Sequence, residues 1–376
     1  MNILVINWQD LRNPQAGGAE VQFQQVFSRL AAAGHGVTLL CSSFPDAPPE
    51  ETLGGVRVLR RGARPVFNYL VPGLYARLTR RERFDVVVDD MNKVPFFTPL
   101  FVREPLCGLV HHLFGRSIYR EVGPLTSSYV YAMERAALSL YRRRGIPFMV
   151  VSPSTREDML ASGFAERNLC VVPLAVDHAL FRPTGVPRST RPLLGYVGRL
   201  KRYKSIDHLI ASLPAVRQAV PDAGLVIIGE GDDRGRLERL VGQLGLAGAV
   251  EFAGFVPEEE KVRRLQEIWC MVMPSSKEGW GLTVTEANAC GTPAVASNVP
   301  GLRDAVIDGE TGLLYPYGDV GALARCAVAI LSDSSVRDRM AARAVEFAAR
   351  FTWEESAERT SAFLSAIIRD RRGSAT

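Results

Sequence analysis

Short apolar runs alternate along the chain with longer segments in which apolar residues recur at every third or fourth position. The runs contain mainly Val, Ile and Leu, which is typical of buried strands, and the longer segments have the period of amphipathic helices. This alternation predicts an α/β fold in which crossover helices join parallel strands. Strands are predicted at residues 2–7, 36–41, 56–60, 84–89, 106–110, 148–152, 169–172, 193–197, 224–229, 249–252, 269–273, 293–296 and 312–315. Helices are predicted at residues 18–33, 68–82, 122–144, 154–162, 204–219, 232–245, 257–267, 282–290 and 319–332.

The segment from Pro173 to Pro192 interrupts this alternation. It contains four prolines and short polar clusters, which are typical of a linker between domains. A chain of 376 residues is also too long for a single hydrophobic core. We therefore predict an N-terminal domain of residues 1–175 and a C-terminal domain of residues 176–353, with a final helix at 354–371.

Composition and charge narrow the range of functions. Residues 1–178 contain 20 Lys and Arg against 16 Asp and Glu, a net charge of +4, and the rest of the chain adds only +1. This balance is too mild to favour nucleic-acid binding. No apolar run approaches the roughly 20 residues of a membrane-spanning helix, and the chain starts directly with a strand-like run. We therefore expect a cytoplasmic protein without a signal peptide.

Metal binding is not predicted by any pattern in the chain. The sequence has no Asp-x-Asp motif, no His-rich tract and no cluster of cysteines. The six cysteines show no close pairs, so we expect free thiols in a reducing compartment. They are Cys41, Cys107, Cys170, Cys270, Cys290 and Cys326.

The stretch from Pro274 to Gly291 gives the strongest functional signal. Glu278 lies in a loop directly after the predicted strand 269–273, and Glu286 lies in the helix that follows. In an open parallel sheet, ligands bind at this carboxyl end of the strands. Backbone amides at the start of the helix would face an anion, namely those of Gly281, Leu282 and Thr283. Amides for phosphate and two carboxylates for hydroxyl groups predict a pocket for a nucleotide sugar.

Two cations follow the first predicted strand of the C-terminal domain. Arg199 and Lys204 lie between that strand and the next helix, where they would neutralise a diphosphate. Lys201 and Arg202 compete for the same role. A lysine at the end of a loop is expected to be exposed, so that its removal would leave the fold intact.

Two features of the N-terminal domain also lie at strand ends. Gly17 and Gly18 open the first helix, where glycines allow a backbone to approach a phosphate or a sugar closely. The third glycine of a dinucleotide-binding fingerprint is missing here, and it is also missing after Gly229-Glu-Gly231, which weakens an oxidoreductase interpretation. His111 and His112 end the strand 106–110 and provide hydrogen-bonding groups at its carboxyl end.

The stretch 274–291 closely resembles the signature of the retaining glycosyltransferases of family 4, also described as glycosyl transferases group 1. The segments 198–204 and 8–20 match the same family, although Ser205 replaces a Gly that many relatives carry there. The resemblance covers nearly the whole chain. It implies the GT-B fold, with two Rossmann-like domains whose parallel sheets face across a cleft and a C-terminal helix that crosses back to the N-terminal domain.

The resemblance also implies a role for each matching residue. Glu286 would hold the ribose hydroxyls of the nucleotide, and Glu278 would bind a hydroxyl of the donor sugar near the reacting carbon. Arg199 and Lys204 would bind the diphosphate. His111, rather than His112, would bind the primary hydroxyl of the sugar and help to orient the acceptor. The remaining donor-binding residues would be Gly17, Gly18, Val256 (through its backbone, to the nucleobase), Gly279, Trp280, Gly281, Leu282 and Thr283.

The implied activity is transfer of a sugar, with retention, from a nucleoside diphosphate-sugar to a small-molecule or glycan acceptor, without a metal or other cofactor. Two other classes remain open: a sugar-nucleotide epimerase with the same fold, and a sugar-nucleotide-binding protein without catalysis. A lipid-linked acceptor is a further alternative, because residues 60–83 combine apolar side chains with arginines that suit an anionic membrane surface. These are Arg60, Arg61, Arg64, Arg77, Arg80, Arg81 and Arg83.

Overall fold

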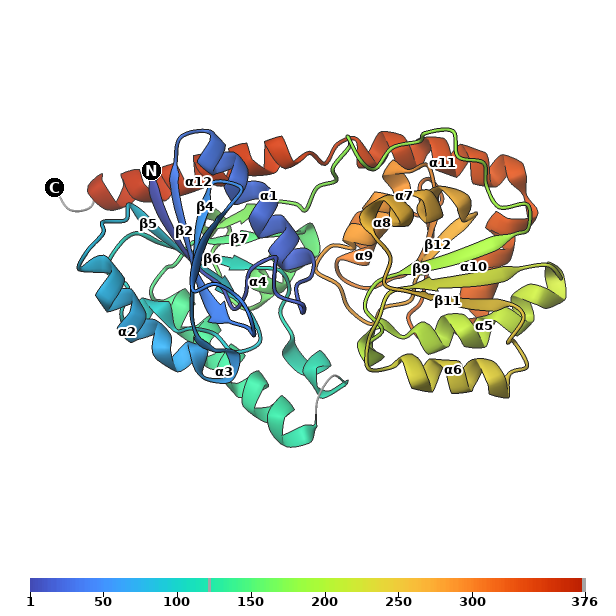
Figure 1. Ribbon diagram of the computed structural model, residues 1–376, viewed down its shortest axis with the longest axis horizontal. Helices are drawn as coiled ribbons and strands as arrows, with labels where there is room; N and C mark the ends of the chain where they lie inside the picture. The colour runs from blue at the N-terminus through green and yellow to red at the C-terminus, as the bar shows by residue number, and fades with distance from the viewer. Residues whose placement is uncertain (121–122, 374–376) are drawn as a thin grey trace. The chain divides into compact units, whose positions relative to one another are not determined.

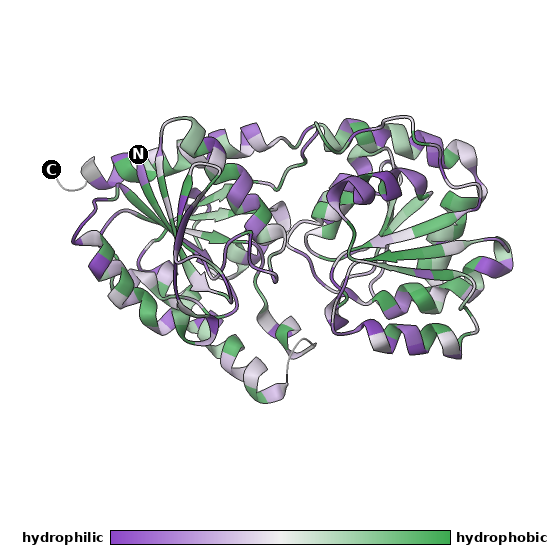
Figure 2. Ribbon diagram, in the orientation of Figure 1, coloured by the Kyte–Doolittle hydropathy of each residue, from purple (hydrophilic) through white to green (hydrophobic). Residues whose placement is uncertain are grey.

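The computed structural model describes residues 1–120 and 123–373, and the chain divides into two compact units (Figure 1). The first unit comprises Met1–Leu174 together with the segment that starts at Trp353, and the second comprises Ala175–Thr352. In each unit helices flank a sheet, and its central strands are the most hydrophobic part (Figure 2). All six cysteines are free thiols. In the described ranges, no helix is both long enough and apolar enough to cross a membrane.

An eight-stranded sheet forms the centre of the first unit, in the order β3-β4-β2-β1-β5-β6-β7-β8. Its strands are β1 (Asn2–Ile6), β2 (Gly36–Ser43), β3 (Glu50–Leu53), β4 (Val56–Ala63), β5 (Val86–Met91), β6 (Leu106–Val110), β7 (Phe148–Val150) and β8 (Leu169–Val171). All neighbouring strands are parallel except β3 and β4, which form an antiparallel pair at one edge. The central strands β1, β5 and β6 are almost wholly buried, because helices cover both faces of a parallel sheet.

The helices of the first unit include the end of the chain. They are α1 (Gly18–Ala32), α2 (Phe67–Thr79), α3 (Pro124–Arg143), α4 (Pro153–Ala161) and α12 (Trp353–Gly373), with short 3-10 turns η1 (Arg64–Val66), η2 (Thr98–Leu100), η3 (Gly115–Arg120) and η4 (Glu166–Asn168). Helix α12 packs against α1. At this contact Arg29 Nε lies 2.8 Å from Glu354 Oε1, and Ser356 Oγ donates a 2.8 Å hydrogen bond to the carbonyl of Pro173. The last helix therefore belongs to the first unit.

A six-stranded, fully parallel sheet forms the centre of the second unit, in the order β11-β10-β9-β12-β13-β14. Its strands are β9 (Leu193–Val197), β10 (Gly224–Ile228), β11 (Val250–Gly254), β12 (Cys270–Met273), β13 (Ala294–Ser297) and β14 (Gly312–Tyr315). The helices are α5 (Ile206–Ala219), α6 (Arg234–Gln243), α7 (Glu258–Glu267), α8 (Leu282–Ala289), α9 (Leu302–Ala305), α10 (Val320–Ser332) and α11 (Ser334–Ala348), with the 3-10 turn η5 (Arg202–Lys204). One hydrophobic core runs through the sheet and the helices on it.

Three elements of the structure were not predicted from the sequence. Strand β3 has two acidic residues in four and lies at the edge of its sheet, so it lacks the apolar run of a central strand. Helix α9 has only four residues. Helix α11 follows α10 after one residue, Asp333, whose side chain accepts a hydrogen bond from the amide of Val336 and caps the new helix. The predicted helix 122–144 starts at Pro124 in the described residues.

Candidate functional site

The strand order of the second unit identifies one particular place at the carboxyl edge of its sheet. Strands β9, β10 and β11 follow one another toward one edge, and β12 then lies on the other side of β9. In an open α/β sheet ligands bind at such a reversal, because the loops after the two strands leave room between them. Lys204 follows β9 and Glu278 follows β12, and Lys204 Nζ lies 2.6 Å from Glu278 Oε1. The predicted cation and the predicted carboxylate therefore meet at the reversal point.

The other groups near this pair show how Lys204 differs from its neighbours. Lys201 pairs with the exposed Asp232 at 2.8 Å, and the Arg202 side chain is 71% exposed. The expectation that Lys204 is exposed is wrong, because its side chain is only 13% exposed. Burial opposes its charge, but Glu278 raises the pKa of Lys204 above the usual lysine value.

Ser275 also contacts Glu278, whereas Arg199 makes no such contact in the described ranges. Ser275 Oγ donates a 2.6 Å hydrogen bond to the same Oε1 atom of Glu278 that Lys204 contacts. The side chain of Arg199 is exposed and makes no ion pair with any residue in the described ranges. Glu278 thus holds the cation of Lys204 in place, whereas the cation of Arg199 has no carboxylate partner in the described ranges.

Helix α8 places the second carboxylate. Its N-cap, Gly281, has a φ of +101°, a left-handed conformation that favours glycine. The backbone amides of Leu282 and Thr283 donate no hydrogen bond to the described part of the chain. Glu286 lies one turn further along and is buried, with its Oε2 atom 3.2 Å from Lys261 Nζ.

Lys261 was not predicted as part of the site. Burial raises the pKa of Glu286, and Lys261 opposes that rise. Lys261 comes from α7, and its only visible signal was a spacing of three residues from Glu258, which is typical of an exposed ion pair on a helix. Its contact with Glu286 depends on how α7 and α8 pack, which the sequence pattern does not give.

Close backbone packing explains three glycines at this edge. A side chain at Gly301 would put its Cβ atom 2.4 Å from the carbonyl oxygen of Glu278, and one at Gly229 would lie 2.1 Å from the carbonyl oxygen of Gly198. Gly231 is packed in the same way, because its Cβ atom would lie 2.1 Å from the carbonyl oxygen of Leu200.

The other predicted donor-binding residues differ in accessibility. The Trp280 side chain is buried in a T-shaped contact with Phe351. Val256 is half-buried after β11, and its neighbour Phe255 is 83% exposed. Gly279 lies between Glu278 and Trp280 and is partly exposed. Phe255 is a further candidate at this edge that the sequence did not single out.

At the carboxyl edge of the first unit, His111 follows β6 and Asp90 lies near the end of β5. His111 Nε2 lies 3.6 Å from Asp90 Oδ1, which is too long for a hydrogen bond. Neither oxygen of Asp90 has a hydrogen-bond partner among the described residues, although its side chain is only 1% exposed. Burial opposes charge on His111, but Asp90 raises the pKa of its ring. The sequence did not predict Asp90, whose only signal was a pair of acids closing an apolar run.

The predicted glycines lie at the start of α1. The amide of Gly17 donates a 2.7 Å hydrogen bond to Glu20 Oε2, and α1 begins at Gly18. Burial raises the pKa of Glu20, which lies near enough to His111 to favour its charged form. The ring of His112 packs against Phe114 instead, with 4.4 Å between ring centroids. Glu20 and Asp90 are therefore two acids that both favour the charged form of His111.

One of the arginines in residues 60–83 that were predicted to suit a membrane surface does not lie on the surface. Arg60 is fully buried, so it cannot contact a membrane surface. Arg77, Arg80 and Arg81 are exposed, and so is Tyr69 at 69%. In the described ranges, no group of three or more His, Cys, Asp and Glu side chains is arranged to hold a metal ion.

Comparison with known proteins identifies the family. The model of the Glycosyltransferase Family 4 domain matches residues 16–180, and the model of Glycosyl transferases group 1 matches residues 179–347. A D-inositol 3-phosphate glycosyltransferase of Corynebacterium urealyticum is 37% identical over 184 residues, which are 47% of this chain and 43% of that relative. The chain thus matches less than half of the length of that relative. The protein belongs to the family 4 glycosyltransferases.

Solved structures confirm the predicted fold class. Sucrose-phosphate synthase from Thermosynechococcus elongatus superposes with a TM-score of 0.83 at 22% identity, and the match covers 98% of this chain and 99% of that one. Anabaena Alr3699/HepE, solved in complex with UDP-glucose, gives a TM-score of 0.77 at 18% identity over 97% of this chain and 100% of that one. At these identities the likeness shows the shared GT-B fold.

Proposed function

We propose that the protein is a retaining glycosyltransferase that moves a sugar from a nucleoside diphosphate-sugar to a hydroxyl group of a small-molecule or glycan acceptor. The observation that carries the proposal is the 2.6 Å contact between Lys204 and Glu278 at the strand reversal. It lies in the same loop region as the unpaired amides that open α8. Glu286 adds a buried carboxylate in the same helix, which suits the vicinal hydroxyls of a ribose.

The groups around Lys204 and Glu278, where the donor is proposed to bind, would act mainly by stabilising the leaving group. Negative charge grows on the diphosphate as the sugar departs, and Lys204, the exposed Arg199 and the α8 amides would neutralise it. These groups supply positive charge without a metal, so we propose that no metal cofactor is required. Glu278 would hold both Lys204 and a hydroxyl of the donor sugar.

Retention is proposed to follow the front-face route. Glu278 Oε1 already accepts hydrogen bonds from Lys204 and Ser275, which makes this oxygen a poorer nucleophile toward the sugar carbon. In the proposed step the bond between the anomeric carbon and the phosphate oxygen breaks while the acceptor oxygen bonds to the same face of that carbon. The proton of the acceptor hydroxyl passes to the departing phosphate oxygen.

The acceptor end is proposed to include His111 and Asp90 of the first unit. Asp90 has two buried carboxylate oxygens that lack hydrogen-bond partners in the described ranges, and hydroxyl groups are the donors that would satisfy them. His111 beside it can donate or accept a hydrogen bond. This pairing suits a polyhydroxylated acceptor such as a sugar or a cyclitol.

An NMR assay tests the proposal. UDP-glucose is the first donor to try, because Alr3699/HepE was solved with it, and GDP- and dTDP-sugars follow. Acceptors should include D-inositol 3-phosphate, which appears in the name of the matched relative, and simple sugars. The expected result is a new α-glycoside from the α-linked donor in the presence of a chelator. A β-glycoside would contradict retention, activity only with added Mg²⁺ or Mn²⁺ would contradict metal independence, and a new nucleotide sugar without an acceptor would indicate an epimerase.

A lipid-linked acceptor at a membrane surface is the second candidate. It is favoured by exposed Tyr69 and Leu70 on α2, together with exposed arginines on the same helix and just after it. Vesicle co-sedimentation tests it. Binding to anionic but not to neutral vesicles, lost at high salt and in the Arg77/Arg80/Arg81 triple substitution, would support this candidate. No binding at low ionic strength would contradict it.

A further inference from the structure

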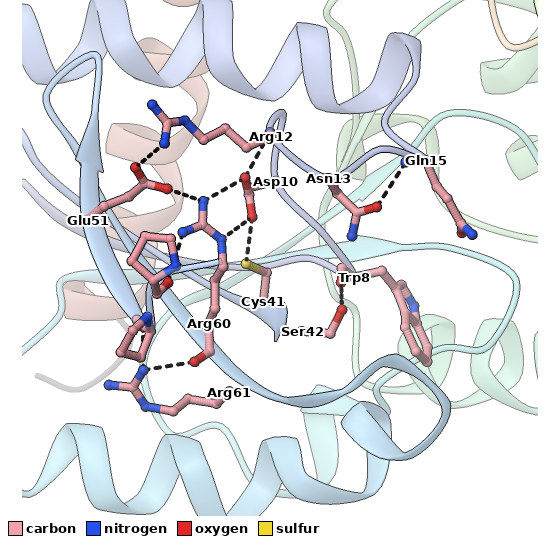
Figure 3. Close-up of polar contacts among 12 residues, drawn as sticks. Trp8, Asp10, Arg12, Asn13, Gln15, Cys41, Ser42, Glu51, Arg60 and Arg61 are labelled. Atoms are coloured by element: carbon pink, nitrogen blue, oxygen red, sulfur yellow. Dashed lines mark hydrogen bonds and ion pairs between the residues drawn. The ribbon is translucent and has the colours of Figure 1, made fainter. Parts of the chain in front are cut away.

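A closed ring of four charged residues lies beneath the loop between β1 and α1 (Figure 3). Asp10 and Arg12 belong to that loop, Glu51 belongs to β3, and Arg60 belongs to β4. Two cations and two carboxylates make the ring neutral. The loop carries Gly17 and Gly18, so the ring connects a predicted substrate-contacting segment to the edge of the sheet.

The central contact is a buried, two-pronged ion pair. Arg60 Nε lies 2.7 Å from Asp10 Oδ2, and Arg60 Nη2 lies 2.9 Å from Asp10 Oδ1. Both side chains are fully buried. A planar guanidinium that donates two parallel hydrogen bonds fixes the orientation of a carboxylate as well as its position. Burial alone would raise the pKa of Asp10, but these bonds hold it below its usual value.

The other contacts close the ring. Glu51 Oε1 lies 2.5 Å from Arg60 Nη2, and Glu51 Oε2 lies 3.0 Å from Arg12 Nη1. The backbone amide of Arg12 donates a 2.9 Å hydrogen bond to Asp10 Oδ1. Each carboxylate therefore contacts both the strand arginine and the loop arginine.

Successive hydrogen bonds connect Asp10 to the residues just before α1. The amide of Asn13 donates to the carbonyl of Asp10 at 3.1 Å, and the amide of Ala16 donates to the carbonyl of Asn13 at 2.8 Å. The Asn13 side chain also accepts a 2.9 Å hydrogen bond from the amide of Gln15. Gly17 follows directly, so its backbone position depends on Asp10 through successive turns.

We infer that Arg60, through Asp10, is a positioning residue that fixes the β1–α1 loop in the conformation required for sugar transfer. The inference rests on the proposed glycosyltransferase function and on the predicted contact of Gly17 and Gly18 with the donor. A pair that served only stability would behave differently, because replacing both members of a buried ion pair by uncharged groups commonly restores stability. The double replacement still removes the contact between Arg60 and Asp10 that holds the loop. Stability can therefore recover while the loop stays unfixed.

The experiment compares Arg60→Met with Arg57→Met. Arg57 lies on the same strand and also pairs with a carboxylate of β3, Glu50 at 2.6 Å, but it does not contact the loop. In Arg60→Met we expect about tenfold faster hydrogen–deuterium exchange in residues 8–18. We also expect a fall in kcat of about tenfold to a hundredfold, because small misplacements of a site are costly. Arg57→Met should change neither quantity.

The double variant Asp10→Asn/Arg60→Met separates positioning from stability. The inference requires that its melting temperature rises above that of Arg60→Met while kcat stays low, and that Arg60→Lys regains part of kcat. Recovery of kcat together with stability would overturn it, and so would unchanged loop exchange in Arg60→Met.

If Arg60→Met does not fold, Arg60→Lys provides the decisive variant, because lysine keeps the buried positive charge but cannot make the two-pronged contact with Asp10. It should speed exchange in residues 8–18 and lower kcat about threefold, in line with partial loosening of the loop. Wild-type values for both would refute the inference. Absence of transfer by the unaltered protein would instead contradict the proposed function, and the exchange measurement would still decide whether the ring holds the loop.

Discussion

The carboxyl edges of the two sheets both carry buried carboxylates, but the partners of these carboxylates differ. In the second unit each acid has a lysine partner, Lys204 for Glu278 and Lys261 for Glu286. In the first unit Asp90 has no hydrogen-bond partner in the described ranges and only a 3.6 Å approach to His111. A carboxylate paired with a lysine holds that cation where it can bind a phosphate. A carboxylate whose oxygens accept no hydrogen bond can instead bind hydroxyl groups. This difference supports the proposal that the donor binds at the second edge and the acceptor at the first.

The largest effect is expected from Lys204→Met. This change removes a charge that would stabilise the departing diphosphate, so turnover should fall about a hundredfold or more, or roughly 3 kcal/mol. Because Lys204 is buried, the change also leaves Glu278 without its cation, and we now expect a lower melting temperature as well. Steady-state kinetics and thermal unfolding measure the two effects.

The matched control is Lys201→Met. Lys201 lies in the same loop, but its side chain is 40% exposed and its partner Asp232 is exposed too. Turnover and stability should stay close to those of the wild type, since exposed ion pairs contribute little. Equal losses in the two variants would show that the loop needs its total charge rather than the Lys204–Glu278 contact.

The next effect is a pH dependence of the folding stability, which originates in the first unit. Asp89, beside Asp90 in β5, is fully buried, and burial raises its pKa from 3.8 to about 6. A raised pKa stabilises the fold below the unfolded value of 3.8, and this contribution is lost as the pH rises through about 6. A shift of about two units corresponds to roughly 3 kcal/mol, about half of it between pH 5 and 7.5.

Urea unfolding at pH 5 and pH 7.5 measures this loss, with Asp89→Asn as the comparison. The amide oxygen can still accept the hydrogen bonds of Thr98 and Tyr141 but does not titrate. The wild type should lose stability relative to the variant as the pH rises. A constant difference between the two proteins would show that Asp89 does not titrate in this range.

A smaller effect separates the two carboxylates of the second unit. Glu286→Gln should weaken binding of free nucleoside diphosphate about tenfold, because the ribose hydroxyls lose a charged acceptor. Glu278→Gln should lower turnover of the intact donor and leave that affinity nearly unchanged. Isothermal titration with UDP and steady-state kinetics measure the split. Similar losses of UDP affinity in both variants would mean that the two roles are not separate.

The two edges also differ in how much of them the sequence predicted. The donor stretch is continuous, so its strand, turn, helix and both acids could be placed from local pattern alone. Contacts between elements could not be placed in this way. Lys261 meets Glu286 because α7 packs beside α8, and Asp10 meets Arg60 because β4 pairs with β2 near β1. Strand order and helix packing decide such contacts, and periodicity does not reveal either.

The smallest effect concerns Ser205, which lies between η5 and α5. Ser205 has a left-handed backbone with φ 51° and ψ 38°, which costs a residue with a side chain about 1 kcal/mol. Its hydroxyl lies 3.0 Å from the hydroxyl of Tyr317, a hydrogen bond worth about 1 kcal/mol. Ser205→Gly loses the bond but also the strain, so the free energy of unfolding should change by less than about 1 kcal/mol. Ser205→Ala loses the bond and keeps the strain, so it should be less stable than Ser205→Gly by about 1 kcal/mol. Chemical unfolding of both variants decides the matter, and equal stability would show that the left-handed backbone at residue 205 costs a side chain little.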